Sequence, residues 1–157
     1  MGSGDSGGAA AAKRLYEAMR EARDRARQAY AAPLRDAVER LGRLVFDESF
    51  RVSLSDDLRI ESRSAGEGVT VPFEWLSGGA REQLSLVYRA ACATLVAEDG
   101  GAPLLLDDAL GYTDPERLRR MGAVLARAAK SCQIVIFTCV PERYAHVGEV
   151  SVVPLPA

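Results

Sequence analysis

Apolar residues recur at alternating steps of four and three between positions 15 and 29 of the chain. This spacing is typical of the narrow apolar seam of a coiled coil. Because the seam is short, it predicts a helical arm over residues 9–46 that is the stub of a longer coiled coil. An amphipathic helix that packs on its own domain is the alternative, and Pro33 is expected to kink or restart the helix. The seam residues are Leu15, Met19, Ala22, Ala26 and Ala29.

Beyond this arm the apolar pattern changes to a period of two, which is typical of β-strands. Apolar residues alternate over positions 50–54 and return over 58–60, with the turn-forming string SDD at 55–57 between them. We therefore expect a β-hairpin. A second turn at 66–68 predicts a short third strand over residues 69–72.

The second half of the chain alternates helix and strand patterns. A helix is expected over residues 80–98, a wholly apolar strand over 103–107, a helix over 115–130 and a second apolar strand over 133–138. Such strands are typical of parallel sheets that are buried on both faces, and the order strand, helix, strand favours a right-handed crossover. The tail at 149–155 could add an edge strand. The predicted fold class is α/β with a parallel sheet, preceded by the hairpin and the arm.

Composition narrows the class of protein without changing this outline. The 157 residues are 48% hydrophobic, which is enough for the core of one domain. Lys and Arg number 20 against 22 Asp and Glu, so the formal charge of −2 excludes a uniformly basic DNA-coating protein. No apolar run is long enough to span a bilayer. The odd number of cysteines, far from any C-x-x-C spacing, favours a reduced, cytoplasmic protein.

The chain start and the cysteines carry no chemistry of their own. Residues 1–8 (MGSGDSGG) lack the pattern of a signal peptide and are expected to form a flexible linker or an engineered start. The arm then follows, and residues 47–157 are expected to form a single lobe after it. The three cysteines lie in apolar runs without a C-x-x-C spacing, which predicts reduced core residues and neither a disulfide nor a zinc site. They are Cys92, Cys132 and Cys139.

The string LSGG at residues 76–79 stands directly before a predicted helix. Glycine lets the backbone approach a ligand closely, and a helix N-terminus presents N–H groups and the positive end of its dipole. Ser77 adds a hydroxyl donor, so the segment is suited to bind a phosphate. The alternative is an ordinary loop, because Ser-Gly strings are common.

Acidic residues follow the first apolar strand and precede the next helix. Asp107 ends the strand, where α/β folds place their ligands, and is suited to hold Mg²⁺ through water. Asp108 is placed to orient or deprotonate an attacking water. Asp114 lies just before Pro115, where it or Thr113 would cap the next helix. Helix capping or simple solvation is the alternative role for these carboxylates.

Taken in this order, the motifs resemble the C-terminal lobe of an ABC-type ATPase head. The preceding helical arm points to the SMC/RecN/SbcC branch, and the strings LSGGAREQL, LLLDDAL and FTCVPERY look most like the YhaN-like bacterial ATPases. The resemblance covers about residues 9–154. It implies an ATP-binding signature motif at Ser77, Gly78 and Gly79, a Walker B metal residue Asp107 with a catalytic Asp108, and a D-loop residue Asp114.

The resemblance also implies cofactors and partners. In this family two heads sandwich two ATP molecules with Mg²⁺, so Ser77 would act in trans on the γ-phosphate held by a second head. Arg89 matches a basic switch position that links ATP binding to arm movement, and an exposed helix arginine is its alternative. The implied partners are a second head in a homodimer, DNA, and a nuclease or loader subunit, with no membrane.

Three departures from the family pattern bear on activity. Asp108 stands where a glutamate is usual, and the shorter side chain slows catalysis, since misplacement by about 1 Å can cost about 100-fold in rate. Val140 falls where a switch histidine is expected, and the single histidine, His146, is expected at the surface. No G-x-x-x-x-G-K-[ST] loop is present, so ATP binding would need the N-terminal Walker A lobe of the same protein.

We therefore expect the C-terminal part of an SMC-like ATPase head. With its N-terminal lobe and on dimerisation, it would bind ATP and hydrolyse it slowly to gate DNA binding in repair, chromosome maintenance or defence. Two alternatives remain open. One is an ATP-gated dimerisation module without significant hydrolysis, and the other is the nucleotide-binding subunit of an ABC transporter.

Overall fold

The first element of the chain is a single long helix. The computed structural model describes residues 5–66, 68–97, 100–111 and 113–155, and helix α1 spans Asp5–Gly42. The expected flexible linker is wrong for its second half, because the helix already begins at Asp5; the alanine run that follows is a strong helix former and extends the helix backwards. The helix also continues through Pro33 and does not restart there.

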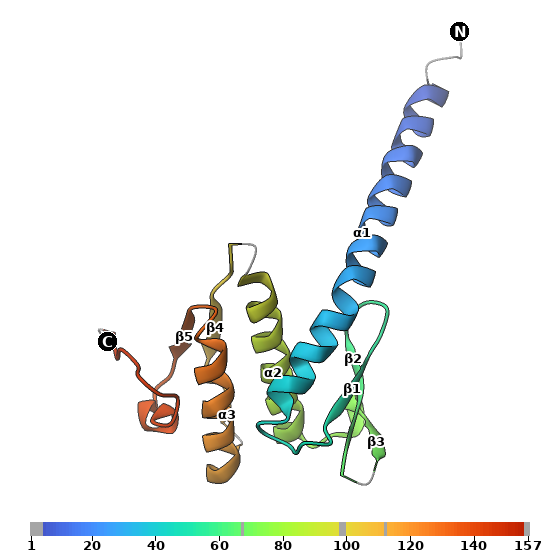
Figure 1. Ribbon diagram of the computed structural model, residues 1–157. Coiled ribbons are helices and arrows are strands. Elements are labelled where there is room, and N and C mark those ends of the chain that lie inside the picture. The colour runs from blue at the N-terminus through green and yellow to red at the C-terminus, as the bar shows by residue number, and fades with distance from the viewer. Residues whose placement is uncertain (1–4, 67, 98–99, 112, 156–157) are drawn as a thin grey trace.

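Helix α1 has an exposed half and a buried half. Figure 1 shows its first half projecting away from the rest of the molecule, and the seam residues Leu15 and Met19 are 63% and 65% exposed. After Pro33 the helix packs on α2 and buries Leu34 and Val38. The interpretation as a helix packing on its own domain is thus correct for the second half, while the predicted seam faces solvent in this single chain.

The predicted hairpin and third strand are confirmed. Strands β1 (Arg51–Leu54), β2 (Ile60–Ala65) and β3 (Val69–Pro72) form an antiparallel sheet in that order. The turn between β1 and β2 is tied to the arm, since the Arg27 guanidinium lies 2.6 Å from the Asp57 carboxylate. Strand β1 contacts the same helix further along, at Glu39, so the hairpin lies along the second half of α1.

The second half of the chain is a mixed α/β unit. A short 3-10 helix, η1 (Phe73–Trp75), leads into α2 (Gly78–Val96), which is followed by β4 (Leu104–Asp107), α3 (Pro115–Ala128), β5 (Ile134–Phe137) and the 3-10 helix η3 (Pro141–Tyr144). Strands β4 and β5 pair in parallel along their whole length. The predicted strand, helix, strand order and the parallel pairing are confirmed.

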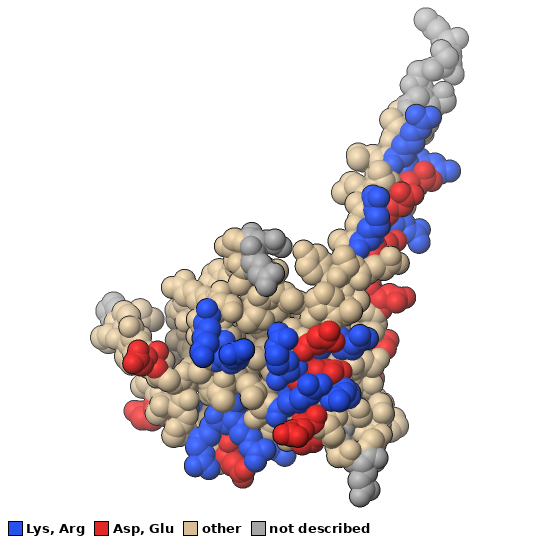
Figure 2. Space-filling model, in the orientation of Figure 1, with Lys and Arg blue, Asp and Glu red and all other residues tan. Residues whose placement is uncertain are grey.

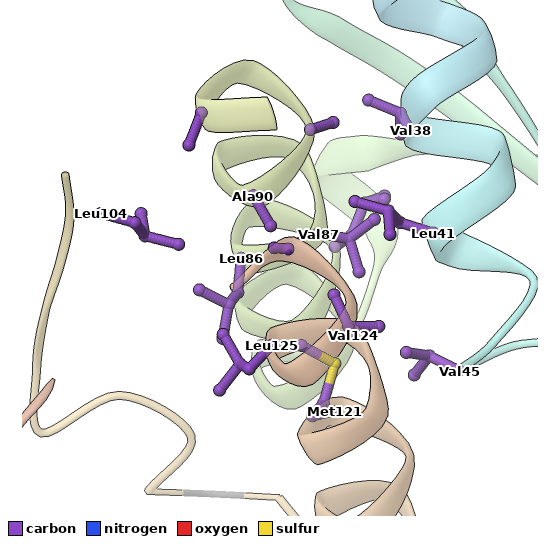
Figure 3. Packing of buried hydrophobic residues seen from close by; sticks show 14 of the residues in the cluster. Val38, Leu41, Val45, Leu86, Val87, Ala90, Leu104, Met121, Val124 and Leu125 are labelled. Carbon is purple, nitrogen blue, oxygen red and sulfur yellow. The ribbon is translucent and has the colours of Figure 1, made fainter. Parts of the chain in front are cut away.

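One hydrophobic core joins the three helices and β4. Figure 3 shows side chains of α1, α2, α3 and β4 converging, among them Val38, Val87, Leu104 and Leu125. Apolar burial of this kind stabilises a fold by roughly 1.5–3 kcal/mol for each large side chain. The core therefore fixes the position of α2, which follows the LSGG segment, and of α3, which follows the acidic residues.

The expectation that β4 is buried on both faces is wrong. Leu104 and Leu106 are buried, whereas Leu105 is 51% exposed and Asp107 is also exposed. On β5, Phe137 is 46% exposed. The helices of the described residues cover one face of this sheet, so burial alternates along the apolar run.

The remaining expectations concern the C-terminal tail, the cysteines and membrane-spanning helices. The tail at residues 149–155 is exposed and forms no strand within the described chain, because it pairs with neither sheet. Cys132 is buried and Cys92 half-buried, so a core position is correct for them, but Cys139 is exposed. No helix of the described ranges has the length and apolar character needed to cross a bilayer.

Gly122 provides a test of this packing. A Cβ atom at Gly122, in the middle of α3, would lie 2.6 Å from the carbonyl oxygen of His146. We expect Gly122→Ala to lower the free energy of unfolding by about 1–3 kcal/mol, because α3 and the segment after η3 would have to separate. Urea denaturation measures this change.

The matched control is Gly8→Ala in the exposed part of α1, where no atom lies within 4 Å of the added Cβ. This substitution should leave the urea midpoint of unfolding unchanged or raise it, since alanine is a better helix former than glycine by about 1 kcal/mol. Equal midpoints for the two variants would contradict the close packing of α3 on the backbone at His146.

Candidate functional site

The motifs meet at one end of the α/β unit. Helices α2 and α3 begin at the end of the molecule where β4 and β5 finish (Figure 1). The Glu82 carboxylate of α2 accepts a hydrogen bond from the Leu110 backbone N–H at 2.6 Å, and Gln83 Nε2 lies 3.4 Å from Thr113 Oγ1. These contacts join the first turns of α2, which follow the LSGG segment, to the loop between β4 and α3, although the paired residues lie 28 and 30 positions apart in the sequence.

Ser77 is the N-cap of α2. Its hydroxyl oxygen accepts a hydrogen bond from the Ala80 N–H at 3.3 Å, and the side chain is exposed. Gly78 is exposed too, with open space within 4 Å of where a Cβ atom would lie, and Gly79 is half-buried. As an acceptor in the cap, the hydroxyl keeps its proton for an external ligand. The helix end is thus open to an anion.

Asp107 and Asp108 differ in their surroundings. Asp107 ends β4 with an exposed side chain and has no side-chain hydrogen bond or ion pair within the described residues. Asp108 has a φ of +40°, and its N–H donates to the Phe137 carbonyl at 2.8 Å. Its carboxylate accepts from Thr138 Oγ1 at 3.3 Å and lies 3.8 Å from an Arg143 nitrogen. Asp108 is therefore held in place, whereas Asp107 is available.

Asp114 is the N-cap of α3, as one of the sequence expectations proposed. Its carboxylate accepts from the Arg117 N–H at 3.0 Å and lies 3.5 Å from the Arg117 guanidinium. The hydrogen bond from the Arg117 backbone, more than the charge of the guanidinium, holds the pKa of Asp114 below its ordinary value of 3.8. The capping role is therefore present whatever else this residue does.

Arg89 lies apart from the other candidate residues. It is exposed on α2, three turns beyond Ser77, and its guanidinium donates to the Leu105 carbonyl at 2.6 Å. Successive residues of a strand direct their backbone N–H and C=O groups to opposite edges. Because the Leu104 N–H donates to Gln133 on the β5 side, the Leu105 carbonyl lies on the edge of β4 that faces away from β5. Beside it an open apolar recess of about 390 Å³ is lined by Cys92, Val96 and Pro103 among others.

Several residues of the site were missed by the sequence analysis. Glu82 lies in the string LSGGAREQL, and Thr138, Arg143 and Tyr144 lie in FTCVPERY, but the resemblance assigned none of them a role. Tyr144 donates its hydroxyl to the Ala109 carbonyl, and burial raises the pKa of this phenol. The position of Thr138 was a further signal, since it follows the second parallel strand, where ligand-facing residues are expected.

Val140, one of the two residues considered for a switch histidine, lies near the site. The N–H of Val140 donates to Thr138 Oγ1 at 3.0 Å, and its side chain is exposed. His146 is exposed as expected. Among the described residues no group of three or more His, Cys, Asp or Glu side chains is arranged to hold a metal ion, so any metal here would need water and ligand oxygens as well.

Basic side chains do not form a continuous patch on the face drawn in Figure 2. Lys and Arg lie beside Asp and Glu along α1 and the start of α3, as in the pairs Arg43–Glu39 at 3.1 Å and Arg120–Glu116 at 2.5 Å. On this face positive and negative charges largely compensate each other.

Comparison with known proteins finds no matching family model. Three uncharacterized proteins, one from Mycobacterium bovis and two from strains of Mycobacterium tuberculosis, are each 48% identical to the chain over 139 residues. The match covers 88% of this chain but 16% of each relative. The chain therefore spans about one sixth of the length of these mycobacterial proteins.

The Asp114 cap gives a pH-dependent test. Because folding lowers the pKa of this carboxyl, its charge stabilises the fold above the ordinary value of 3.8, and this contribution is lost as pH falls through the lower folded value. We expect Asp114→Asn, which keeps a capping oxygen without the charge, to be less stable than the wild type at pH 7. The difference should disappear near pH 2. Chemical denaturation at both pH values measures it, and a difference that is the same at both would exclude the charge as its cause.

Proposed function

We propose that the chain is the C-terminal lobe of an SMC-like ATPase head of the SbcC and YhaN type. Completed by an N-terminal Walker A lobe and paired with a second head, it binds ATP and hydrolyses it slowly. The observation that carries this proposal is that one chain exposes both the Ser77 cap and the Asp107 and Asp108 strand end at the same end of the α/β unit, with α2 joined to the loop after β4 by the contact of Glu82 with Leu110.

In the proposed mechanism the start of α2 serves the nucleotide of the neighbouring head. The Ser77 hydroxyl and the N–H groups of Gly78 and Gly79 would donate to the γ-phosphate, where the helix dipole also favours negative charge. The exposure of Ser77 and Gly78 supports this role, because a buried cap could not reach a second molecule. The acidic strand end of the same chain would serve its own nucleotide.

The acidic residues fit Mg²⁺ chemistry by their donor atoms. Mg²⁺ prefers oxygen ligands and is usually bound through one or two carboxylates together with waters and phosphate oxygens. Asp107 offers such a carboxylate at the end of β4. Asp108, oriented by Thr138 and Arg143, would direct the attacking water. The ion itself would neutralise charge on the phosphates.

The uncovered surfaces support an N-terminal lobe as the partner. Leu105 and Phe137 are about half exposed, the outer edge of β4 is contacted by Arg89, and the recess beside it is apolar. A free sheet edge and an apolar face are usually covered by further structure. Most of each mycobacterial relative lies outside the matched segment, which leaves room for such a lobe and for a coiled coil continuing α1.

We propose that the head acts on DNA in the cytoplasm. Engagement of two heads would move the arms formed by α1 and gate a clamp on DNA, in repair, chromosome maintenance or defence. A nuclease or loader subunit would be a further partner. The arm also argues against a transporter subunit, since α1 spans Asp5–Gly42 and its exposed seam is suited to a second helix.

A second candidate function is ATP-gated dimerisation without significant hydrolysis. Two observations favour it. The carboxylate of Asp108 is one methylene shorter than that of glutamate and is already hydrogen-bonded to Thr138, and Val140 cannot donate a side-chain hydrogen bond to a phosphate. Both candidates share the ATP sandwich and differ only in turnover.

Asp108→Asn separates the two candidates. In a head completed with its Walker A lobe, we expect single-turnover hydrolysis to fall at least about 100-fold, because the group that orients or deprotonates water is lost. Asp56→Asn, in the exposed hairpin turn, removes the same charge and should change nothing. An unchanged rate for Asp108→Asn would favour the dimerisation module.

Mixing variants tests whether Ser77 acts in trans. Ser77→Arg and Asp108→Asn heads should each be inactive alone. In a mixed dimer one site combines an intact Asp108 with an intact Ser77 from the other head, so an equal mixture should regain up to about a quarter of wild-type activity. Absence of any recovery, with dimers confirmed by light scattering, would contradict the shared site.

A further inference from the structure

The loop after β4 has an unusual backbone conformation. Asp108 has a φ of +40° and Leu110 a φ of +68°, and Leu110 is 1% exposed. Positive φ is uncommon for residues other than glycine and is an outlier for a bulky side chain, so it persists only where the surroundings impose it. The loop that carries the candidate catalytic carboxylate is therefore held by its neighbours.

Contacts from three places hold this loop. The Glu82 carboxylate accepts from the Leu110 N–H at 2.6 Å, and the Tyr144 hydroxyl donates to the Ala109 carbonyl. Thr138, after β5, donates to the Asp108 carboxylate at 3.3 Å. Among these, Glu82 alone belongs to the helix that begins with Ser77.

The contact with the Leu110 N–H leaves the other carboxylate oxygen of Glu82 without hydration. Its second oxygen, Oε2, is enclosed and has no hydrogen-bond partner among the described residues, and the same is true of Oε1 of the neighbouring Gln83, which is 1% exposed. Enclosing a carboxylate oxygen without a partner is unfavourable, so the side chain is best explained by the conformation it imposes. That conformation is the left-handed turn at Leu110.

We propose that Glu82 is a positioning residue that couples the first turns of α2 to Asp108, an inference that rests on the proposed function. Glu82 lies five residues after Ser77, and Leu110 lies two residues after Asp108. Glu82 already joins the Leu110 amide to α2 in the single chain. When Ser77 engages a neighbour's nucleotide, a shift of the first turns of α2 would be passed through Glu82 to the Leu110 amide and so to Asp108, which would then be placed to direct water. Hydrolysis on one head then depends on engagement by the other.

The test compares Glu82→Ala, which removes the acceptor, with Glu82→Gln, whose amide oxygen can accept the same hydrogen bond. Two quantities are measured: hydrogen exchange of the Leu110 amide in this chain, and kcat and KM for ATP in the completed head. For Glu82→Ala we expect exchange at least about tenfold faster and kcat about tenfold lower, with KM changed by less than about twofold. Glu82→Gln should restore both quantities to within a few-fold of wild type.

The matched control is Glu61→Ala on β2, which removes a carboxylate that accepts from Ser53 Oγ at 3.2 Å. It should change neither quantity. If Glu82→Ala does not fold, as judged by circular dichroism, Glu82→Met fills the same space without an oxygen and should give the same two changes.

The outcomes separate this inference from the proposed function. Unchanged Leu110 exchange in Glu82→Ala overturns the restraint of the loop. Faster exchange with unchanged kcat, in a wild-type head that hydrolyses ATP, shows a structural role and overturns the coupling. A wild-type completed head that binds no ATP rejects the proposed function and the coupling with it, while the exchange result still decides whether Glu82 holds the loop.

Discussion

The burial of α2 between α1 and α3 is the contact on which the rest of the structure depends. Leu84, Val87 and Ala90 are fully buried, and α2 contacts both α1 and α3. Figure 3 shows Val87 and Ala90 of α2 with side chains of α1 and α3 around them. Since this packing fixes the axis of α2, it also fixes where the helix N-terminus points. The position of the exposed Ser77 cap is therefore set by the core, and the LSGG string by itself does not predict it. Stability and the candidate anion site depend on the same helix.

The polar contacts at the strand ends follow from this packing. With α2 in place, Glu82 reaches the loop after β4, and with α3 close against the segment after η3 through Gly122, Tyr144 reaches the same loop. Two elements thus impose a left-handed backbone on Asp108 and Leu110 that neither residue favours by itself. Such a loop is stiff because it is held from both sides, and in the proposed mechanism this stiffness would keep the Asp108 carboxylate oriented toward a water molecule.

The open face of the parallel sheet distinguishes this chain from a self-contained α/β domain. Parallel strands are usually covered on both faces, yet here Leu105 and Phe137 remain about half exposed and α1 carries an exposed apolar seam. The chain nevertheless encloses one continuous core. It follows that the core holds the chain together, while the uncovered surfaces are suited to further polypeptide.

The sequence by itself determined the order of the helices and strands, the hairpin, the third strand, the parallel pair and a cap before Pro115, which the structure assigns to Asp114 in place of Thr113. These features depend on periodicity, turn residues and caps, which act between residues close together in the chain. Only the tertiary structure decided that one face of β4 stays open, that Cys139 is exposed and that Glu82 and Tyr144 hold the loop after β4. Those two hydrogen bonds join residues 28 and 35 positions apart, and a contact over such a separation leaves no local pattern in the sequence.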